Sequence, residues 1–139
     1  MPASLSASYF EHGADIGIEG NGATVEEAFE QAARAVFAIM TDIDEVRPLV
    51  RVDIAFAEDD VELALVTWLN RLLAEARIQG LVFGSFRLHR SGALWSGEAL
   101  GEPWRPELAR GVEVKGATLT MLSVRRSNGG WTARCVVDV

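Results

Sequence analysis

Few residues of this sequence could do chemistry, and three of them are polar groups near its two ends. His12 and Asp15 flank a glycine in a segment that indicates a tight turn, which can hold polar side chains close together. Asp138 is the penultimate residue, so its carboxylate lies beside the main-chain and terminal oxygens of Val139. Hard cations such as Ca²⁺ and Mg²⁺ prefer oxygen-only ligand sets. The pattern therefore predicts a divalent-cation site around Asp138 and marks His12 and Asp15 as a second candidate site.

Each candidate also has a purely structural interpretation. Asp15 can accept a hydrogen bond from the backbone of its own turn, which would leave His12 half exposed. Asp138 can be a solvated acid on a frayed chain end. Against fraying, the run from Trp131 to Val137 is strongly strand-like and should hold the end in a sheet. The residue types alone leave both interpretations open.

Other catalytic groups are not recognisable in the sequence. It contains neither a Gly-x-Ser-x-Gly nucleophile motif nor a glycine-rich phosphate loop. Because Cys135 is the single cysteine, an internal disulfide and a cysteine-based zinc site are excluded. We interpret Cys135 as a small buried hydrophobic residue. We therefore expect no catalytic residues and a protein that is not an enzyme. A metal hydrolase that uses a metal-activated water is an alternative.

Size and charge narrow the classes of function. The 139 residues suit one domain spanning 1–139, and 13 basic against 20 acidic residues give a formal charge of −7. This charge argues against direct nucleic-acid binding, which needs clustered positive charge. No apolar run approaches the ~20 residues that cross a bilayer, and the first residues do not resemble a secretory signal. We expect a cytoplasmic protein with no membrane partner.

The elements that must position these residues follow from periodicity and turn signals. Two extended pieces are expected within 7–18, and a capping box at Thr24–Glu27 predicts a helix that ends near Thr41. Acidic residues at 58–60 and Gly80 bound a second helix. Strands are expected at 50–57, 81–89, 93–100, 112–124 and 131–139. Two helices cannot cover both faces of so much sheet. The expected fold is therefore an α+β two-layer domain, with two helices packed on one face of a mixed, largely antiparallel β-sheet.

Six segments resemble the archease family, in the order in which that family has them. They are His12–Ile18, Thr24–Phe29, Val66–Leu73, Gly101–Trp104, Glu113–Thr118 and Val136–Val139. The first is similar to the family's His-Thr-Ala-Asp-Ile/Val-Gly-Ile motif, and the last is similar to its Val-x-Asp-Val/Ile end. The resemblance runs from about Tyr9 to Val139, nearly the whole chain, and the six ordered matches together make it specific.

The resemblance implies an accessory role. Archeases assist the GTP-dependent tRNA-splicing RNA ligase of the RtcB type: they speed guanylylation of the ligase's active-site histidine, support multiple turnover and broaden its nucleotide use. The acidic charge of this chain suits a basic RNA enzyme as partner better than RNA itself. The alternative from another class is a chaperone-like module that modulates other proteins through an exposed sheet face.

The resemblance also implies the metal ligands. The family binds a divalent cation, interpreted as calcium, through residues that correspond to Asp15, Asp138 and Val139, with Mg²⁺ and Mn²⁺ as other candidates. We do not count His12 as a ligand, since a hard cation prefers oxygen. Two positions depart from the family pattern. Gly13 replaces the usual threonine, which removes a hydroxyl near the metal, and Leu119-Thr120 stands where the family commonly has Tyr-His.

Overall fold

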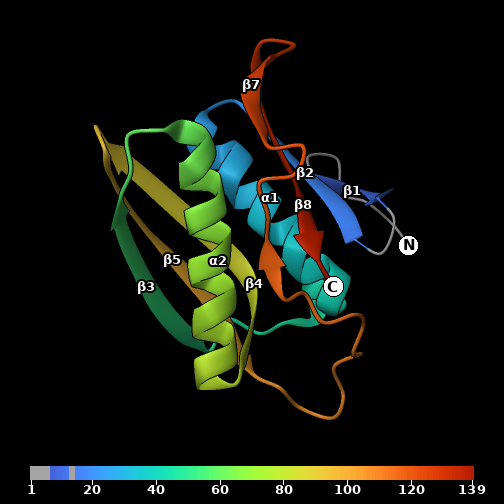
Figure 1. Cartoon of the computed structure of the whole chain (residues 1–139). Coiled ribbons are helices and arrows are strands. Elements are labelled where there is room, and N and C mark those ends of the chain that lie inside the picture. Colours follow the sequence, from blue (N-terminus) through green and yellow to red (C-terminus); the bar gives the residue numbers. More distant parts are fainter. Residues whose placement is uncertain (1–6, 13–14) are drawn as a thin grey trace.

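The computed structural model describes residues 7–12 and 15–139, which form eight strands, two α-helices and a 3-10 turn, η1 (Figure 1). In chain order these are β1 (Ala7–His12), β2 (Asp15–Gly22), α1 (Val25–Met40), η1 (Ile43–Glu45), β3 (Val50–Ala57), α2 (Val61–Gln79), β4 (Leu81–Ser91), β5 (Leu94–Pro103), β6 (Gly116–Ala117), β7 (Ser123–Ser127) and β8 (Gly130–Asp138). Among the described residues, no helix is both long and apolar enough to cross a membrane.

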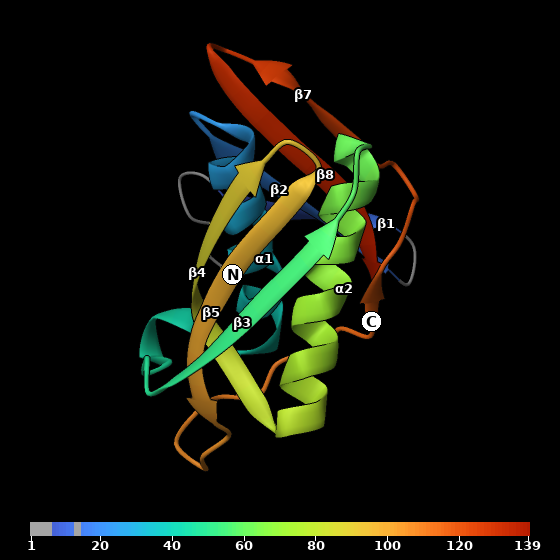
Figure 2. The same ribbon diagram turned by 90° about the vertical axis from the view of Figure 1, so that its left-hand side faces the viewer.

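The strands divide into two antiparallel sheets. The first has the order β1-β2-β8-β6, with β7 also paired to β8, and the second has the order β3-β5-β4 (Figure 2). The predicted α+β class with two helices is confirmed. The predicted single sheet is replaced by two, because the segment after β5 returns to the first sheet and delivers β6, β7 and β8 there.

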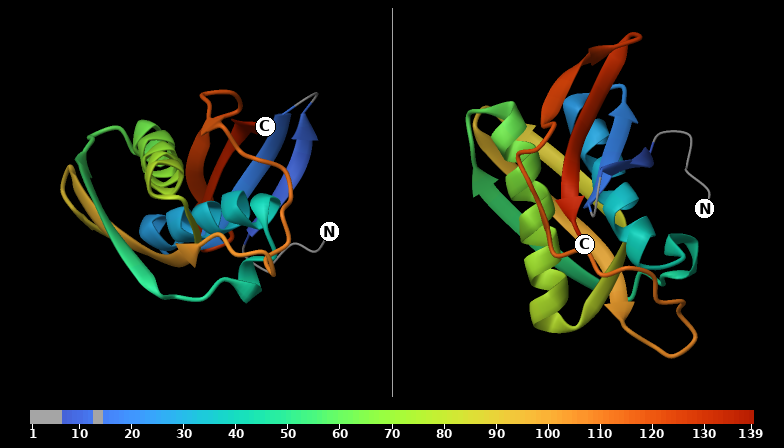
Figure 3. Two further views of the ribbon diagram at one scale, coloured as in Figure 1. Left: turned by 90° about the horizontal axis from the view of Figure 1, so that it is seen from below. Right: turned by 45° about the vertical axis from the view of Figure 1, so that its right-hand side comes forward.

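The helices lie between the two sheets (Figure 3). Helix α1 presents its small residues Ala28 and Ala32 to β2, where Gly20 lets the two backbones approach closely. Its larger side chains face the second sheet: Phe29 stacks on Trp95 with ring centroids 5.2 Å apart, and Phe37 meets Phe83 edge-on at 5.5 Å. Each sheet therefore covers the helical layer with one face and leaves its other face outside.

The predicted helix ends are confirmed by their capping bonds. Thr24 Oγ1 accepts a bond from the Glu27 backbone N–H at 3.1 Å, and Glu27 reaches back to the backbone N–H of Ala23 at 2.8 Å. The Asp60 carboxylate caps α2 by accepting bonds from the backbone N–H groups of Glu62 and Leu63, and Gly80 ends α2 with φ 66°, a left-handed conformation that glycine adopts readily.

The expected strand from 112 to 124 is wrong for most of its length. Only Gly116–Ala117 and the residues from Ser123 onward pair with β8. The alternating apolar pattern at its start reflects an irregular segment in which Val114 is buried while Val112 is exposed. This segment is held by a side chain of α2 and not by a continuous strand ladder. Arg77 donates a hydrogen bond to the carbonyl oxygen of Lys115 at 3.0 Å.

Candidate functional site

The two acidic residues predicted as ligands lie at the same end of two paired strands. Asp15 is the first residue of β2 and Asp138 is the last residue of β8. The antiparallel register pairs Ile16 with Val137, and one further step places Asp15 across from Asp138. Directly opposed residues of antiparallel strands share a face, with Cβ atoms about 4.5–5.5 Å apart. We call Asp15, Asp138 and Val139 the carboxylate edge.

A row of backbone positions crosses four strands at this edge. His12 of β1 pairs with Asp15, and Gly116 of β6 pairs with Asp138. The side chain of His12 and the predicted turn residues Gly13 and Ala14 lie outside what the structure describes. The topology thus brings β2 and β8 together, as the cation hypothesis requires of Asp15 and Asp138.

Strand β6 holds the end of β8 and is itself held by α2. The Asn70 side chain spans Ala117 with two bonds, because its amide donates to the Ala117 carbonyl at 3.2 Å and its Oδ1 accepts from the Ala117 N–H at 2.8 Å. The backbone N–H of Lys115 donates to the carbonyl oxygen of Asp138 at 2.8 Å. The Thr118 hydroxyl donates to the carbonyl oxygen of Val136 at 2.8 Å. The last residues of the chain are therefore fixed from one side by a helix-anchored segment.

The charge at the edge is not balanced by the side chains of residues 15–139. Neither Asp15 nor Asp138 forms an ion pair with any of these side chains, whereas six ion pairs occur elsewhere among them. Asp138 is exposed, and Asp15 and Val139 are half-buried. Two acidic residues at opposed strand positions, with Val139 next in the chain, offer carboxylate and main-chain oxygens, which are the donors that a hard cation prefers.

Side chains alone do not complete a metal site there. Among the side chains of residues 15–139, no three His, Cys, Asp or Glu groups gather in a way that could hold a metal ion. A cation at the carboxylate edge would therefore have to complete its coordination with oxygens of Val139, with water or with a partner. Ca²⁺ takes six to eight oxygen ligands and commonly uses such mixed sets.

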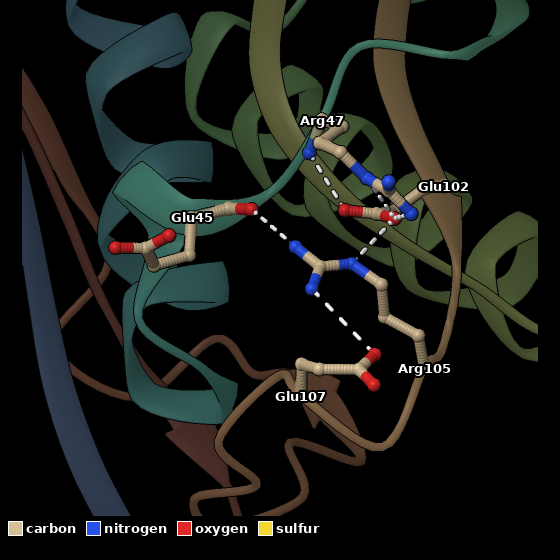
Figure 4. Close-up of polar contacts among 5 residues, drawn as sticks. All are labelled: Glu45, Arg47, Glu102, Arg105 and Glu107. Carbon is tan, nitrogen blue, oxygen red and sulfur yellow. Dashed lines mark hydrogen bonds and ion pairs between the residues drawn. The ribbon is translucent and has the colours of Figure 1, made fainter.

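A second polar cluster was not predicted from the sequence. Glu102 is fully buried and accepts three hydrogen bonds, from the backbone N–H and Nε of Arg47 at 2.7 and 2.9 Å and from Nε of Arg105 at 2.9 Å (Figure 4). A hydrogen bond from the Arg47 side chain is the main cause that lowers the pKa of Glu102 to about 2. Burial opposes this shift, and Arg105 adds to it. Arg105 also donates to the carbonyl oxygen of Glu45 at 2.9 Å. The cluster ties η1 and the start of β3 to the end of β5.

Two signals in the sequence could have identified these supporting residues. Glu102 lies between a glycine and a proline in one of the segments that resemble archeases, and Asn70 follows Trp68 in another. In this fold, the acid and the amide of these two segments hold neighbouring backbone segments by hydrogen bonds. Trp68 has one as well, since its ring N–H donates to the Phe29 carbonyl at 3.0 Å and joins the two helices.

Comparison with known proteins identifies similarity along nearly the whole described chain. The model of the archease protein family (MTH1598/TM1083) matches residues 8–139. The archease of Pyrococcus furiosus is 37% identical over 137 residues, which cover 94% of this chain and 96% of that protein. The archease of Sulfolobus acidocaldarius is 37% identical over 134 residues, with the same coverage of both chains.

A solved structure agrees with these sequence matches. The solution structure of protein 1598 from Methanobacterium thermoautotrophicum superimposes with a TM-score of 0.85 and 29% identity, and the match covers 96% of this chain and 99% of that one. The archease of Methanosarcina mazei is 35% identical and covers 94% of each chain. All three ligands of the predicted cation site fall inside the range that the family model matches.

Proposed function

Because this chain belongs to the archease family, we propose that it is an accessory protein that activates a GTP-dependent tRNA-splicing RNA ligase. Its task is to promote guanylylation of the ligase and to support multiple turnover. The formal charge of −7 favours association with a basic RNA enzyme. In this role the chain itself performs no catalysis, and it acts in the cytoplasm with its ligase.

The part of the molecule that we assign to this task is the carboxylate edge. We propose that Asp15, Asp138 and Val139 hold a divalent cation, Ca²⁺ in first place and Mg²⁺ or Mn²⁺ as alternatives. A bound cation would neutralise the two carboxylates and add a positive centre that accepts oxygen ligands from the partner or its nucleotide. The residues themselves orient these oxygens, because β2 and β6 hold the end of β8 from both sides.

The single observation that carries this proposal is the register between β2 and β8. It brings two acids that are far apart in the sequence to opposed positions at one edge, and neither has an ion-pair partner among the side chains of residues 15–139. Two like charges at such a distance disfavour one another unless a cation or solvent compensates them. A site that gathers uncompensated carboxylates is the arrangement expected of cation binding.

The test is a ligation assay with the ligase of the same organism, at limiting concentrations of this protein. Asp15→Ala and Asp138→Ala are expected to abolish the stimulation of guanylylation and turnover. Asp59→Ala is the matched control, since Asp59 is an exposed acid at the start of α2 and its loss changes the net charge equally. The control variant should stimulate as the wild type does.

Two further measurements separate the alternatives. Thermal unfolding with and without Ca²⁺ should show a rise in Tm for the wild type and for Asp59→Ala but none for the two edge variants. Full stimulation by either edge variant would refute the proposed site. Suppression of aggregation of unrelated proteins, independent of divalent ions, would instead support the chaperone-like alternative.

A further inference from the structure

A hollow of about 260 Å³ lies where the C-terminal ends of both helices meet the irregular segment 104–115. This segment connects β5 to β6 and runs across the lower end of the molecule in Figure 1. We call this cavity the helix-end hollow. It contains no residue of the carboxylate edge. Its volume equals that of about nine water molecules at ~30 Å³ each, enough for an apolar body of roughly ten non-hydrogen atoms.

The floor of the helix-end hollow is apolar. Both helices, the start of β4 and the irregular segment contribute buried or half-buried side chains to it, namely Met40, Leu73, Ala76, Leu81, Trp104 and Val114. A ligand must be apolar where it meets this floor, because a buried polar group without a hydrogen-bond partner is unfavourable. The half-buried ring of Trp104 favours an aromatic body, since aromatic pairs gain more than their buried area alone provides.

The wall formed by the irregular segment is fixed to the end of α1. The Thr41 hydroxyl donates a hydrogen bond to the carbonyl oxygen of Ala109 at 2.8 Å. The backbone N–H of Gly111 donates to the carbonyl oxygen of Met40 at 2.8 Å, and a Cβ at position 111 would clash with the carbonyl oxygen of Ile39. The hollow is therefore preformed, so a ligand need not spend binding energy on ordering its wall.

The charged side chains that line the hollow are two arginines and one acid, Arg77, Arg110 and Glu113. The Arg110 guanidinium lies over the Trp104 ring, 3.9 Å from its centroid, and Arg77 donates to the carbonyl oxygen of Lys115 at 3.0 Å. Both arginines are exposed, and neither forms an ion pair with a side chain of residues 15–139. A guanidinium has five N–H donors, so both retain donors for another acceptor. The lining thus favours an anion, in a chain whose formal charge is −7.

We propose that the helix-end hollow binds a small aromatic monocarboxylate. The ring occupies the apolar floor, and the carboxylate accepts hydrogen bonds from Arg77 and Arg110, because planar guanidinium and carboxylate groups match in geometry. An inorganic anion would leave the floor empty, and a neutral hydrocarbon would leave both guanidinium groups without an acceptor. This ligand site goes beyond the accessory role proposed above. Its test needs neither a ligase nor a divalent cation, so the two proposals can fail independently.

The experiment is a nuclear magnetic resonance titration of the ¹⁵N-labelled whole protein. The probe is 2-naphthoate, whose two fused rings match the size of the hollow, and 2-naphthamide is the neutral analogue of the same shape. We expect saturable shifts of the amide signals of residues 109–114. The amide should bind about tenfold more weakly or less than that, because hydrogen bonds to a charged group are stronger than those between neutral groups.

Arg110→Ala is the main variant, because the Arg110 side chain is exposed and forms no hydrogen bond that holds the backbone of residues 15–139. It should weaken binding of 2-naphthoate about three- to tenfold. Arg77→Ala should do the same, although it also removes the bond to Lys115. Arg87→Ala is the matched control, since it removes the same charge from an exposed arginine of β4 outside the hollow, and it should stay within about twofold of wild type. The spectra also show whether each variant is folded.

Any of four results would overturn the proposal. One is the absence of saturable binding at millimolar 2-naphthoate, and another is equal affinity for 2-naphthoate and 2-naphthamide. The third is an equal loss of affinity in Arg87→Ala and Arg110→Ala, which would indicate net charge alone. The fourth is a dimer in sedimentation velocity that 2-naphthoate dissociates, which would make a second copy of the chain the occupant of the hollow.

Discussion

Removing the Asn70 side chain tests whether α2 holds β6 beside the carboxylate edge. Asn70→Ala deletes both hydrogen bonds to Ala117, at 2.8 and 3.2 Å. A net contribution of about 0.5–1.5 kcal/mol per bond gives a loss of about 1–3 kcal/mol. Alanine is the better helix former, which returns about 0.5 kcal/mol. We therefore expect the free energy of unfolding to fall by about 0.5–2.5 kcal/mol.

A second variant separates hydrogen bonding from packing. Asn70→Leu keeps roughly the volume of the side chain but offers no donor or acceptor to Ala117. Because Asn70 is only half-buried, water can replace the missing bonds beside a small alanine but not beside leucine. Asn70→Leu should therefore cost at least as much stability as Asn70→Ala. If the cation site is at the carboxylate edge, both variants should also reduce the rise in Tm produced by Ca²⁺.

Urea unfolding followed by circular dichroism measures the loss, with the slope m checked to be unchanged. The expected fall in Tm is roughly 2–8 °C. Gln79→Ala is the control, because it removes an amide from the exposed end of the same helix and should change stability by less than about 0.5 kcal/mol. If neither Asn70 variant is destabilised more than this control, the side chain does not anchor β6 and the reasoning is refuted.

Three other predictions follow from single contacts. Glu102→Gln should destabilise the protein above pH 5, and its difference from wild type should shrink as the pH falls from 4.5 toward 2. The ionised Glu102 stabilises the folded state, because folding lowers its pKa from 4.5 to about 2; this contribution is present above pH 4.5 and is lost as the carboxylate becomes protonated. Urea titrations at several pH values measure the difference in the free energy of unfolding. Gly20→Ala should lower stability by more than about 2 kcal/mol in thermal unfolding, since the added Cβ would clash with the backbone of Ala28 and Ala32. The Cys135 thiol, whose pKa burial raises to about 12, should react with a thiol reagent at pH 8 only at the rate of unfolding.

Local signals were sufficient to predict the helix ends and the hairpin turns from the sequence. Thr24 and Glu27 cap α1 by contacts within four residues, and Gly80 and Gly129 occupy the positive φ angles that their turns require. These features depend on neighbours in the chain, so periodicity and residue type contain the needed information. The last strand was predictable for the same reason, because its apolar residues alternate.

Features that depend on distant residues were not predictable. The two-residue strand β6 exists because Asn70, 47 positions away, bonds its backbone on both sides. Burial of Glu102 depends on Arg47, which lies 55 positions earlier and whose side chain remains largely exposed while it pairs with the buried carboxylate. The pairing of Asp15 with Asp138 came from a resemblance to a family, since no local pattern sets the register between two segments so far apart.

The register of β8 also decides on which face of the strand Asp138 lies. Deleting one residue of β8, such as Val136, would turn Asp138 away from Asp15 to the opposite face, because side chains alternate along a strand. The turn at Asn128 and Gly129 fixes one end of this strand and the segment held by Asn70 fixes the other. The proposed cation site therefore depends on the spacing within β8 as well as on the ligands themselves.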